Sequence, residues 1–324
     1  MEPTRVNQPV TYDAAAWAAI AVLCFMVAAC QWVAPVPFEP RSSVGLIVAC
    51  AALGGTSIFY RTVRLREEFA VMCIALMQVI LFSAVGIVLS YLLARNGGAL
   101  WDATLARWDR ALGFDWLAYV RFVDSSRLLS AVSFVAYGSL IPQIVVLVCT
   151  LGFAKRFAAL RSVMLAAILA GAISIVVSAL MPATAYPSFL GVTNHDFRHV
   201  NPWAGLVHLS DLHALRDGTF AMLDFRKMQG IITFPSYHAG LSAVTLWGFW
   251  SSRPAWIKWP GMTLAALTIA ATPVNGGHYL VDVLAGLGIA VASIVAARKL
   301  VLWNPDLPGL TAWPSRRSRE ASAR

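Results

Sequence analysis

Long apolar runs recur along the whole chain, and they constrain its fold more than any other feature. A helix needs about 20 mostly apolar residues to cross the hydrocarbon core of a bilayer. We place eight such runs at 14–37, 43–60, 69–94, 128–153, 157–182, 237–252, 256–274 and 278–302. The chain is 59% hydrophobic and 13% charged, whereas roughly a quarter of the residues of a soluble domain are charged. The sequence therefore predicts an all-α fold, a polytopic transmembrane helical bundle of about 8 spans.

The net charge of +9 is explained by basic loops on one side of a membrane, without any nucleic-acid partner. Lysine and arginine gather at 61–68, 154–156 and 251–258, which fall in alternate loops, and again in the tail at 304–324. Cytoplasmic loops of membrane proteins collect these residues, so both termini are predicted to be cytoplasmic. We expect the bacterial inner membrane, with the other loops facing the periplasm or a lumen. The tail is predicted to be disordered and attracted to anionic lipid headgroups.

Candidate metal ligands show no recognisable spacing. The cysteines lie inside apolar runs without a CxxC pair, which is typical of small buried hydrophobic residues: Cys24, Cys30, Cys50, Cys73 and Cys149. Four histidines occupy a polar loop: His195, His199, His208 and His213. They match no zinc motif, so we interpret them as solvated loop residues, with a metal site as the alternative. The sequence predicts no metal and no other cofactor.

Two connecting segments are amphipathic. In the 95–127 segment, Trp101, Leu105, Trp108 and Leu112 recur at helical spacing, with charged residues between them. The 203–230 segment is similar and more polar. Both are predicted to form interfacial helices, with the tryptophans at the level of the lipid headgroups.

Two short motifs place histidines at helix starts on the same, outer side of the membrane. FPSYHAG at 234–240 has Pro235 where the first turn of a helix tolerates proline, followed by His238. NGGHYLVDVLAG at 275–286 opens the last span with His278. Asp282 follows four residues later, on the same helical face. An ionisable residue inside a span is a functional candidate by default.

The spacing of His278 and Asp282 suits nucleophilic chemistry. A carboxylate that accepts a hydrogen bond from one imidazole nitrogen fixes the tautomer and leaves the other nitrogen free to attack. Helix N-termini also present free N–H groups and a positive dipole end, which favour phosphate. The two motifs together therefore predict a phosphoryl-transfer site, in which one histidine attacks phosphorus and the other protonates the departing oxygen.

These motifs resemble those of the type 2 phosphatidic acid phosphatase (PAP2) superfamily. Pro235-Ser-Tyr-His238 is similar to its second motif, PSxH, and His278-Tyr-Leu-Val-Asp282 is similar to the HxxxD of its third motif. The resemblance covers most of residues 100–295 and implies a six-helix membrane core that needs no metal. It implies that His278 is a nucleophile forming a phosphohistidine, that Asp282 orients it, and that His238 is the general acid and then the general base.

The chain departs from the usual family pattern where arginines are expected. The third motif usually has an arginine six residues before its histidine, and here that position is Thr272. The first motif, with a lysine and an Arg-Pro pair, is replaced by SALMPATAYPSF at 178–189, which has no basic residue. This pattern is more similar to the inositolphosphorylceramide-synthase-like branch, which has a proline-rich segment there and lacks these arginines. WDRALGFDW and AYGSLIPQ also resemble that branch.

Other groups must then meet the phosphate. Basic side chains of the outer loops are the first candidates: Arg198, Arg216, Arg226 and Lys227. Arg226 and Lys227 could equally be headgroup anchors. The alternative is a set of donors near the motifs: Ser236, Gly276, Gly277, Tyr186 and Asn275.

The sequence predicts three regions and one leading function. Residues 1–68 form two additional N-terminal transmembrane helices, 69–303 the catalytic membrane domain, and 304–324 the tail. We expect an enzyme acting on a membrane lipid phosphate or phosphodiester at the outer face. Water as the acceptor makes it a phosphatase, and a lipid or sugar alcohol makes it a phosphotransferase. A transporter and a haem protein with histidine axial ligands are the alternatives from other classes.

Overall fold

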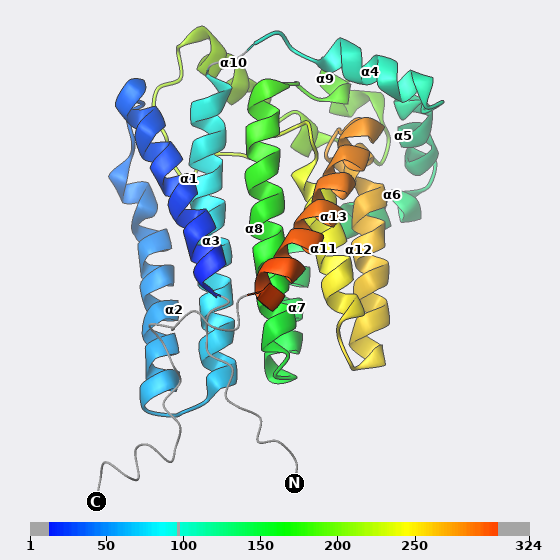
Figure 1. The fold of residues 1–324 in the computed structure, drawn as a ribbon. Coiled ribbons are helices and arrows are strands. Elements are labelled where there is room, and N and C mark those ends of the chain that lie inside the picture. The colour runs from blue at the N-terminus through cyan, green and yellow to red at the C-terminus, as the bar shows by residue number, and fades with distance from the viewer. Residues whose placement is uncertain (1–12, 96–97, 304–324) are drawn as a thin grey trace, which may run out of the picture.

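The computed structural model describes residues 13–95 and 98–303 (Figure 1). The regular secondary structure within them is helical, with one isolated backbone bridge between Phe38 and Leu223. The predicted tail at 304–324 lies outside the described residues. The helices, apart from short 3₁₀ turns, are α1 Asp13–Val33, α2 Val44–Thr62, α3 Glu67–Ala94, α4 Asp102–Ala111, α5 Trp116–Asp124, α6 Arg127–Gly138, α7 Leu140–Phe153, α8 Phe157–Leu180, α9 Tyr186–Leu190, α10 Leu209–Asp217, α11 Tyr237–Trp250, α12 Ala255–Asn275 and α13 Leu280–Trp303.

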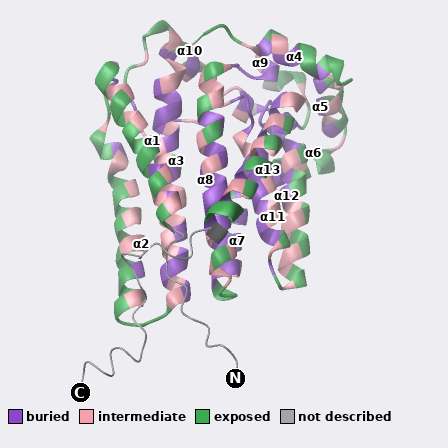
Figure 2. Ribbon diagram, viewed as in Figure 1, coloured by how far each residue is buried: buried purple, intermediate pink, exposed green. Residues whose placement is uncertain are grey.

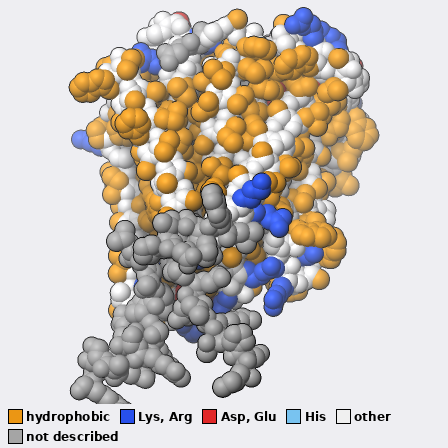
Figure 3. Space-filling model, in the orientation of Figure 1, with side chains coloured by type: hydrophobic (Ala, Val, Ile, Leu, Met, Phe, Trp, Pro, Cys, Tyr) orange, Lys and Arg blue, Asp and Glu red, His pale blue; other side chains and the backbone are white. Residues whose placement is uncertain are grey.

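The fold is a helical membrane bundle, as predicted. In the described part of the chain, five helices are long and apolar enough to cross a bilayer: α1, α2, α3, α8 and α13. A sixth span results if the bent pair α6 and α7 is taken together. The remaining two predicted spans correspond to α11, which has only 14 residues, and to α12, which contains two prolines. Hydrophobic side chains cover most of the lateral face that Figure 3 shows.

The fourth predicted span is broken, where the sequence predicted one helix over 128–153. α6 and α7 meet at Ser139 with a bend of 55°. Pro142 explains the break, because it has no N–H and its ring would collide with the carbonyl four residues earlier, at Gly138. The bend places Tyr137, the penultimate residue of α6, inside the bundle, where it reaches the candidate site described below.

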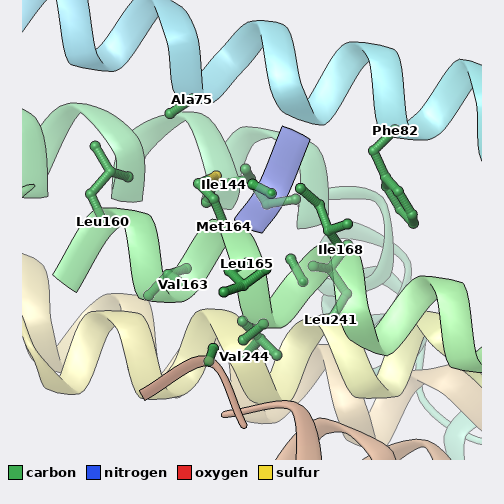
Figure 4. Close-up of a cluster of buried hydrophobic side chains, with 14 of the residues drawn as sticks. Ala75, Phe82, Ile144, Leu160, Val163, Met164, Leu165, Ile168, Leu241 and Val244 are labelled. Carbon is green, nitrogen blue, oxygen red and sulfur yellow. The ribbon is translucent and has the colours of Figure 1, made fainter. Parts of the chain in front are cut away.

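The main hydrophobic core lies between α3, α7, α8, α11 and α13 (Figure 2). Figure 4 shows part of it, with Phe82, Ile144, Ile168 and Leu241 among the labelled side chains. α1 contributes Ala16, Ile20 and Leu23 to the same core, and α2 packs along α3. The two N-terminal helices are thus continuous with the bundle; the division at residue 68 remains a prediction.

The short helices α4, α5, α9 and α10 gather at one end of the bundle (Figure 1). The basic connections α2–α3, α7–α8 and α11–α12 lie at the other end, as their alternate positions in the sequence predicted.

The prediction that the tryptophans are interfacial is wrong for Trp116. This side chain is fully buried, stacks on Tyr186 with ring centroids 5.3 Å apart, and donates to the Pro273 carbonyl. The part of the 95–127 segment around Trp116 therefore packs onto the end of the bundle and covers it.

Candidate active site

The first motif forms the capped start of α11. Ser236 is the N-cap residue, and its Oγ accepts a hydrogen bond from the Ala239 N–H at 3.3 Å. Pro235 therefore precedes the cap, and the prediction that it occupies the first helical turn is wrong by two positions. A serine at the N-cap satisfies one of the free N–H groups of the helix. His238 lies at the second helical position, where its side chain reaches the end of the bundle that α4, α5, α9 and α10 cover.

The free backbone N–H groups at the start of α13 already bind a carboxylate of the protein. Asp109 of α4 accepts hydrogen bonds from the N–H groups of Leu280 and Val281, both at 2.9 Å. A negative charge at this position also complements the helix dipole. The N–H groups that we expected to hold phosphate at this helix start are therefore occupied by the protein itself. The amphipathic pattern of 95–127 gave no sign that Asp109 would be buried.

The predicted contact between His278 and Asp282 is present. The Nδ1 atom of His278 lies 3.3 Å from Oδ2 of Asp282, and the same oxygen accepts from the Tyr279 N–H at 3.0 Å. Asp282 is fully buried, and His278 precedes α13 by two residues. The backbone carbonyl of Thr233 also lies beside this ring. With the proton on Nδ1, the imidazole donates to the carboxylate, and its Nε2 atom has the lone pair that a nucleophile needs.

Two close approaches of the backbone bring α11 and α13 together. The Ser236 N–H donates to the backbone carbonyl of Asp282 at 3.0 Å, which ties the two helix starts directly. One turn further, Gly240 faces Gly286. A Cβ atom at Gly240 would lie 2.9 Å from the Gly286 carbonyl oxygen, and one at Gly286 would overlap the Ser236 carbonyl oxygen. Glycine at both positions therefore sets the distance between the two motifs.

His238 is held against the broken helix. Its ring stacks on Tyr137 with centroids 4.1 Å apart and an interplanar angle of 11°. Its Nε2 atom lies 3.2 Å from the Tyr137 backbone carbonyl. That carbonyl is available because the helix ends at the next residue, and a C-terminal carbonyl has no partner within its own helix. The bend after α6 thus fixes the orientation of this histidine.

His238 and His278 meet in a single cavity of about 260 Å³. Tyr137 and Gly276 line it beside them, and α3 forms a facing wall with Phe82, Ser83, Gly86, Ile87 and Ser90. Hydroxyl and imidazole groups supply its polar surface. Among the described residues that line it there is no lysine, arginine or carboxylate. The described lining of this cavity therefore offers a bound phosphate no permanently charged side chain.

His208 is the functional candidate that the sequence did not reveal. The prediction that it is solvated is wrong, because its side chain is only 4% exposed and lines the same cavity. Its Nε2 atom lies 2.9 Å from the carbonyl of Thr184. Burial lowers the pKa of His208, and the carbonyls of Thr184 and Ala204 oppose that shift. No local pattern in the sequence distinguishes it from His213, which lies five residues later on α10 and is exposed.

A second cavity of about 300 Å³ continues from the first into the apolar core. The two share Phe82, Ser83, Tyr137, Tyr237 and His238. Beyond them, the second cavity is lined by side chains of α3, α7, α8 and α11 that are almost all aliphatic: Val79, Leu140, Ile141, Ile144, Leu147, Val163, Met164, Ala167, Ile168, Leu241 and Val244. The site is therefore polar at the histidines and apolar behind them.

The basic candidates for phosphate binding lie away from the cavity lining. Arg216 donates to the Gly98 carbonyl at 2.7 Å. Arg226 makes two hydrogen bonds to Asp224, at 2.9 and 2.8 Å, and this pairing lowers the pKa of Asp224 to about 2. Arg198 and Lys227 are exposed. A role for these cations in phosphate binding stays a prediction that their positions do not support.

The other predicted donors have partners of their own. Tyr186 stacks on Trp116 and on Tyr279, and Asn275 donates to the Ser133 hydroxyl at 2.6 Å. Ser236 caps α11 as described above. The Gly277 carbonyl accepts from the Tyr186 N–H. Of the donors predicted near the motifs, Gly276 alone lines the cavity in the described structure.

The chain matches one family model, described as the PAP2 superfamily, over residues 103–296. The match begins in α4 and ends inside α13, so it contains both motifs and His208, while α3 and its cavity wall lie outside it. No curated protein and no solved structure matches the chain.

Proposed function

The chain belongs to the PAP2 superfamily, whose model matches more than half of its length, and from this and the site we propose that it is a membrane phosphatase or phosphotransferase acting through a phosphohistidine. Members of this superfamily are typically phosphatases or phosphotransferases. The observation that carries the proposal is that His238 and His278 line one cavity, while the buried Asp282 lies 3.3 Å from Nδ1 of His278 behind it.

The geometry supports a two-step reaction. In the first step, Nε2 of His278 attacks phosphorus, the bond to the leaving oxygen breaks, and His238 gives that oxygen a proton. In the second step, His238 takes a proton from water or an alcohol, whose oxygen attacks phosphorus and breaks the P–N bond. Asp282 keeps His278 in the productive tautomer throughout and stabilises its positive charge in the intermediate.

The apolar cavity favours a lipid substrate. A phosphate placed at the histidines would direct an attached chain toward the lining of Val79, Ile144 and Leu241. Each methylene group buried there contributes about 0.8 kcal/mol to binding. A water-soluble phosphate would leave this volume unused. We therefore propose a lipid phosphate or phosphodiester as the substrate class, taken at the outer face of the membrane, which is the periplasmic face if this is a bacterial inner membrane.

Filling the apolar cavity should discriminate between substrates by chain length. Ala167 of α8 lines it and is 6% exposed. Ala167→Phe is expected to lower kcat/KM for a long-chain lipid phosphate by about tenfold or more, since the aromatic ring displaces several methylene groups. A short-chain soluble phosphate should be turned over within about twofold of wild type. Ile173→Phe adds bulk to an exposed position of the same helix and serves as the control. Equal loss on both substrates would contradict a chain-binding role.

Replacing His238 should reveal its role through the leaving group. His238→Ala is expected to slow the release of an alkyl alcohol about a hundredfold or more, because this leaving oxygen needs a proton. The first step with an aryl phosphate should be affected much less, since an aryl oxide leaves without protonation. Rapid-quench experiments with both substrates give the rate constant of the burst, which reports the first step alone. An equal loss of this rate constant on both substrates would count against general-acid catalysis.

The proposed function is tested by separating hydrolysis from transfer. Purified protein is incubated in EDTA with phosphatidic acid, polyprenyl diphosphate or phosphatidylinositol, with and without an alcohol acceptor. Phosphate release would indicate a phosphatase, and a new phospholipid that forms only with an acceptor would indicate a phosphotransferase, as expected for the inositolphosphorylceramide-synthase-like branch. A strict metal requirement would overturn the mechanism. Absence of both products would favour a transport role for the histidines.

A further inference from the structure

The cavity contains a third histidine that the two-step reaction leaves without a role. His208 is the residue before α10, and the polypeptide between Thr184 and α10 brings it to the same wall as His278. Its Nε2 atom is engaged by the Thr184 carbonyl at 2.9 Å. Within the described residues, its buried Nδ1 atom has no hydrogen-bond partner. An unsatisfied buried polar atom costs about 1–3 kcal/mol, so its retention requires an explanation.

A substrate phosphate supplies that explanation. The cavity has no permanent cation among its described lining residues, and the three histidines are its only side chains that can become positively charged near neutral pH. Two of them already have roles in the proposed reaction, His278 as the nucleophile and His238 as the general acid and base. We propose that His208 binds a phosphoryl oxygen of the substrate, in the place of the arginines that the chain lacks; this inference rests on the proposed function.

The protonation state follows from the surroundings of the ring. A carbonyl oxygen only accepts, so the Thr184 contact places a proton on Nε2. A phosphate oxygen at Nδ1 requires a second proton there, and the negative charge of the substrate favours it. The Ala204 carbonyl lies close enough to favour the protonated ring without making a hydrogen bond of normal geometry. Substrate binding thus converts a buried neutral histidine into a charged donor, whose bonds to phosphate are stronger than neutral ones.

Two substitutions separate phosphate binding from a structural role. His208→Gln retains an amide donor at the position of Nε2 and can still bond the Thr184 carbonyl, but it has no donor at the position of Nδ1. His208→Asn does the reverse. His213→Ala, at an exposed position on α10, is the matched control. Each variant of the full-length, detergent-solubilised chain is checked by thermal unfolding before measurement.

The readouts are the dissociation constant of inorganic phosphate and the kinetic constants for a lipid phosphate. We expect His208→Gln to weaken phosphate binding and raise KM by about tenfold or more, with a smaller effect on kcat. His208→Asn keeps a neutral donor at the position of Nδ1 without the positive charge, so its loss should be clearly smaller than that of His208→Gln, and His213→Ala should match the wild type. Wild-type behaviour of His208→Gln, or equal impairment of both variants, would overturn the proposal.

The same experiment distinguishes this inference from the proposed function. Phosphate binding that depends on His208 in a protein without turnover would retain the binding role and overturn the proposed reaction. Turnover that depends on His278 but is unaffected by either His208 variant would retain the reaction and overturn the binding role. Absence of both phosphate binding and turnover in the wild type would overturn both.

Discussion

His278→Ala is expected to lose turnover by about three orders of magnitude or more, because it removes the atom that attacks phosphorus. Removal of a catalytic nucleophile leaves only the contribution of binding and of the remaining polar groups. The most direct measurement is the covalent intermediate. A lipid phosphate labelled in its phosphoryl group should leave acid-labile, base-stable label on the wild-type protein after a rapid quench, and none on His278→Ala.

Two further variants make this result specific. Asp282→Asn keeps the shape of the residue but favours the wrong tautomer of His278, so a loss of about a hundredfold or more is expected together with a weaker label. His238→Ala with an aryl phosphate should accumulate label, since the step that needs its base is slow. His199→Ala, at an exposed loop position, is the control. Loss of less than about tenfold in His278→Ala would rule out the nucleophile assignment.

The bundle and the paired motifs were predictable because each depends on a local signal. Apolar runs of span length identify membrane helices from composition alone, and the helical repeat predicted a contact between His278 and Asp282 at i,i+4. The contact forms although His278 lies two residues before α13. The structure contains their contact at 3.3 Å. The basic loops lie at one end of the bundle for a similar reason, since alternate connections of an up-and-down bundle must share an end. The domain division and the phosphate ligands remain untested predictions.

The remaining features depend on contacts between residues distant in the sequence. Asp109 caps α13 across 171 positions, and Trp116 reaches the Pro273 carbonyl across 157. Neither the amphipathic spacing around Asp109 nor the composition near Trp116 signals such a partner. His208 is concealed for the same reason, because burial within a polar segment depends on which helices cover it. The break at Ser139 is different: Pro142 was a local signal, and its consequence for Tyr137 followed only from the packing.

Gly286→Ala is expected to destroy activity although residue 286 lies away from the reacting groups. Residue 286 lies one turn beyond Asp282, and a methyl group there would overlap the carbonyl oxygen of Ser236, which caps the helix that carries His238. Backbone cannot rotate away as a side chain can, so α11 and α13 must separate and the two histidines with them. Misplacement of reacting groups by about 1 Å costs about a hundredfold in rate. We expect at least that loss, with a lower thermal midpoint.

Gly288→Ala provides the matched control for this prediction. It lies two residues further along α13, and a Cβ atom there would meet nothing within 4 Å. Alanine is favoured over glycine inside a helix by about 0.8–1 kcal/mol, so this variant should be as stable as wild type or slightly more stable, with full activity. Comparison of the two variants separates the effect of forcing α11 and α13 apart from the effect of alanine on helix propensity. Wild-type activity in Gly286→Ala would show that the distance between α11 and α13 does not set the geometry of the histidines.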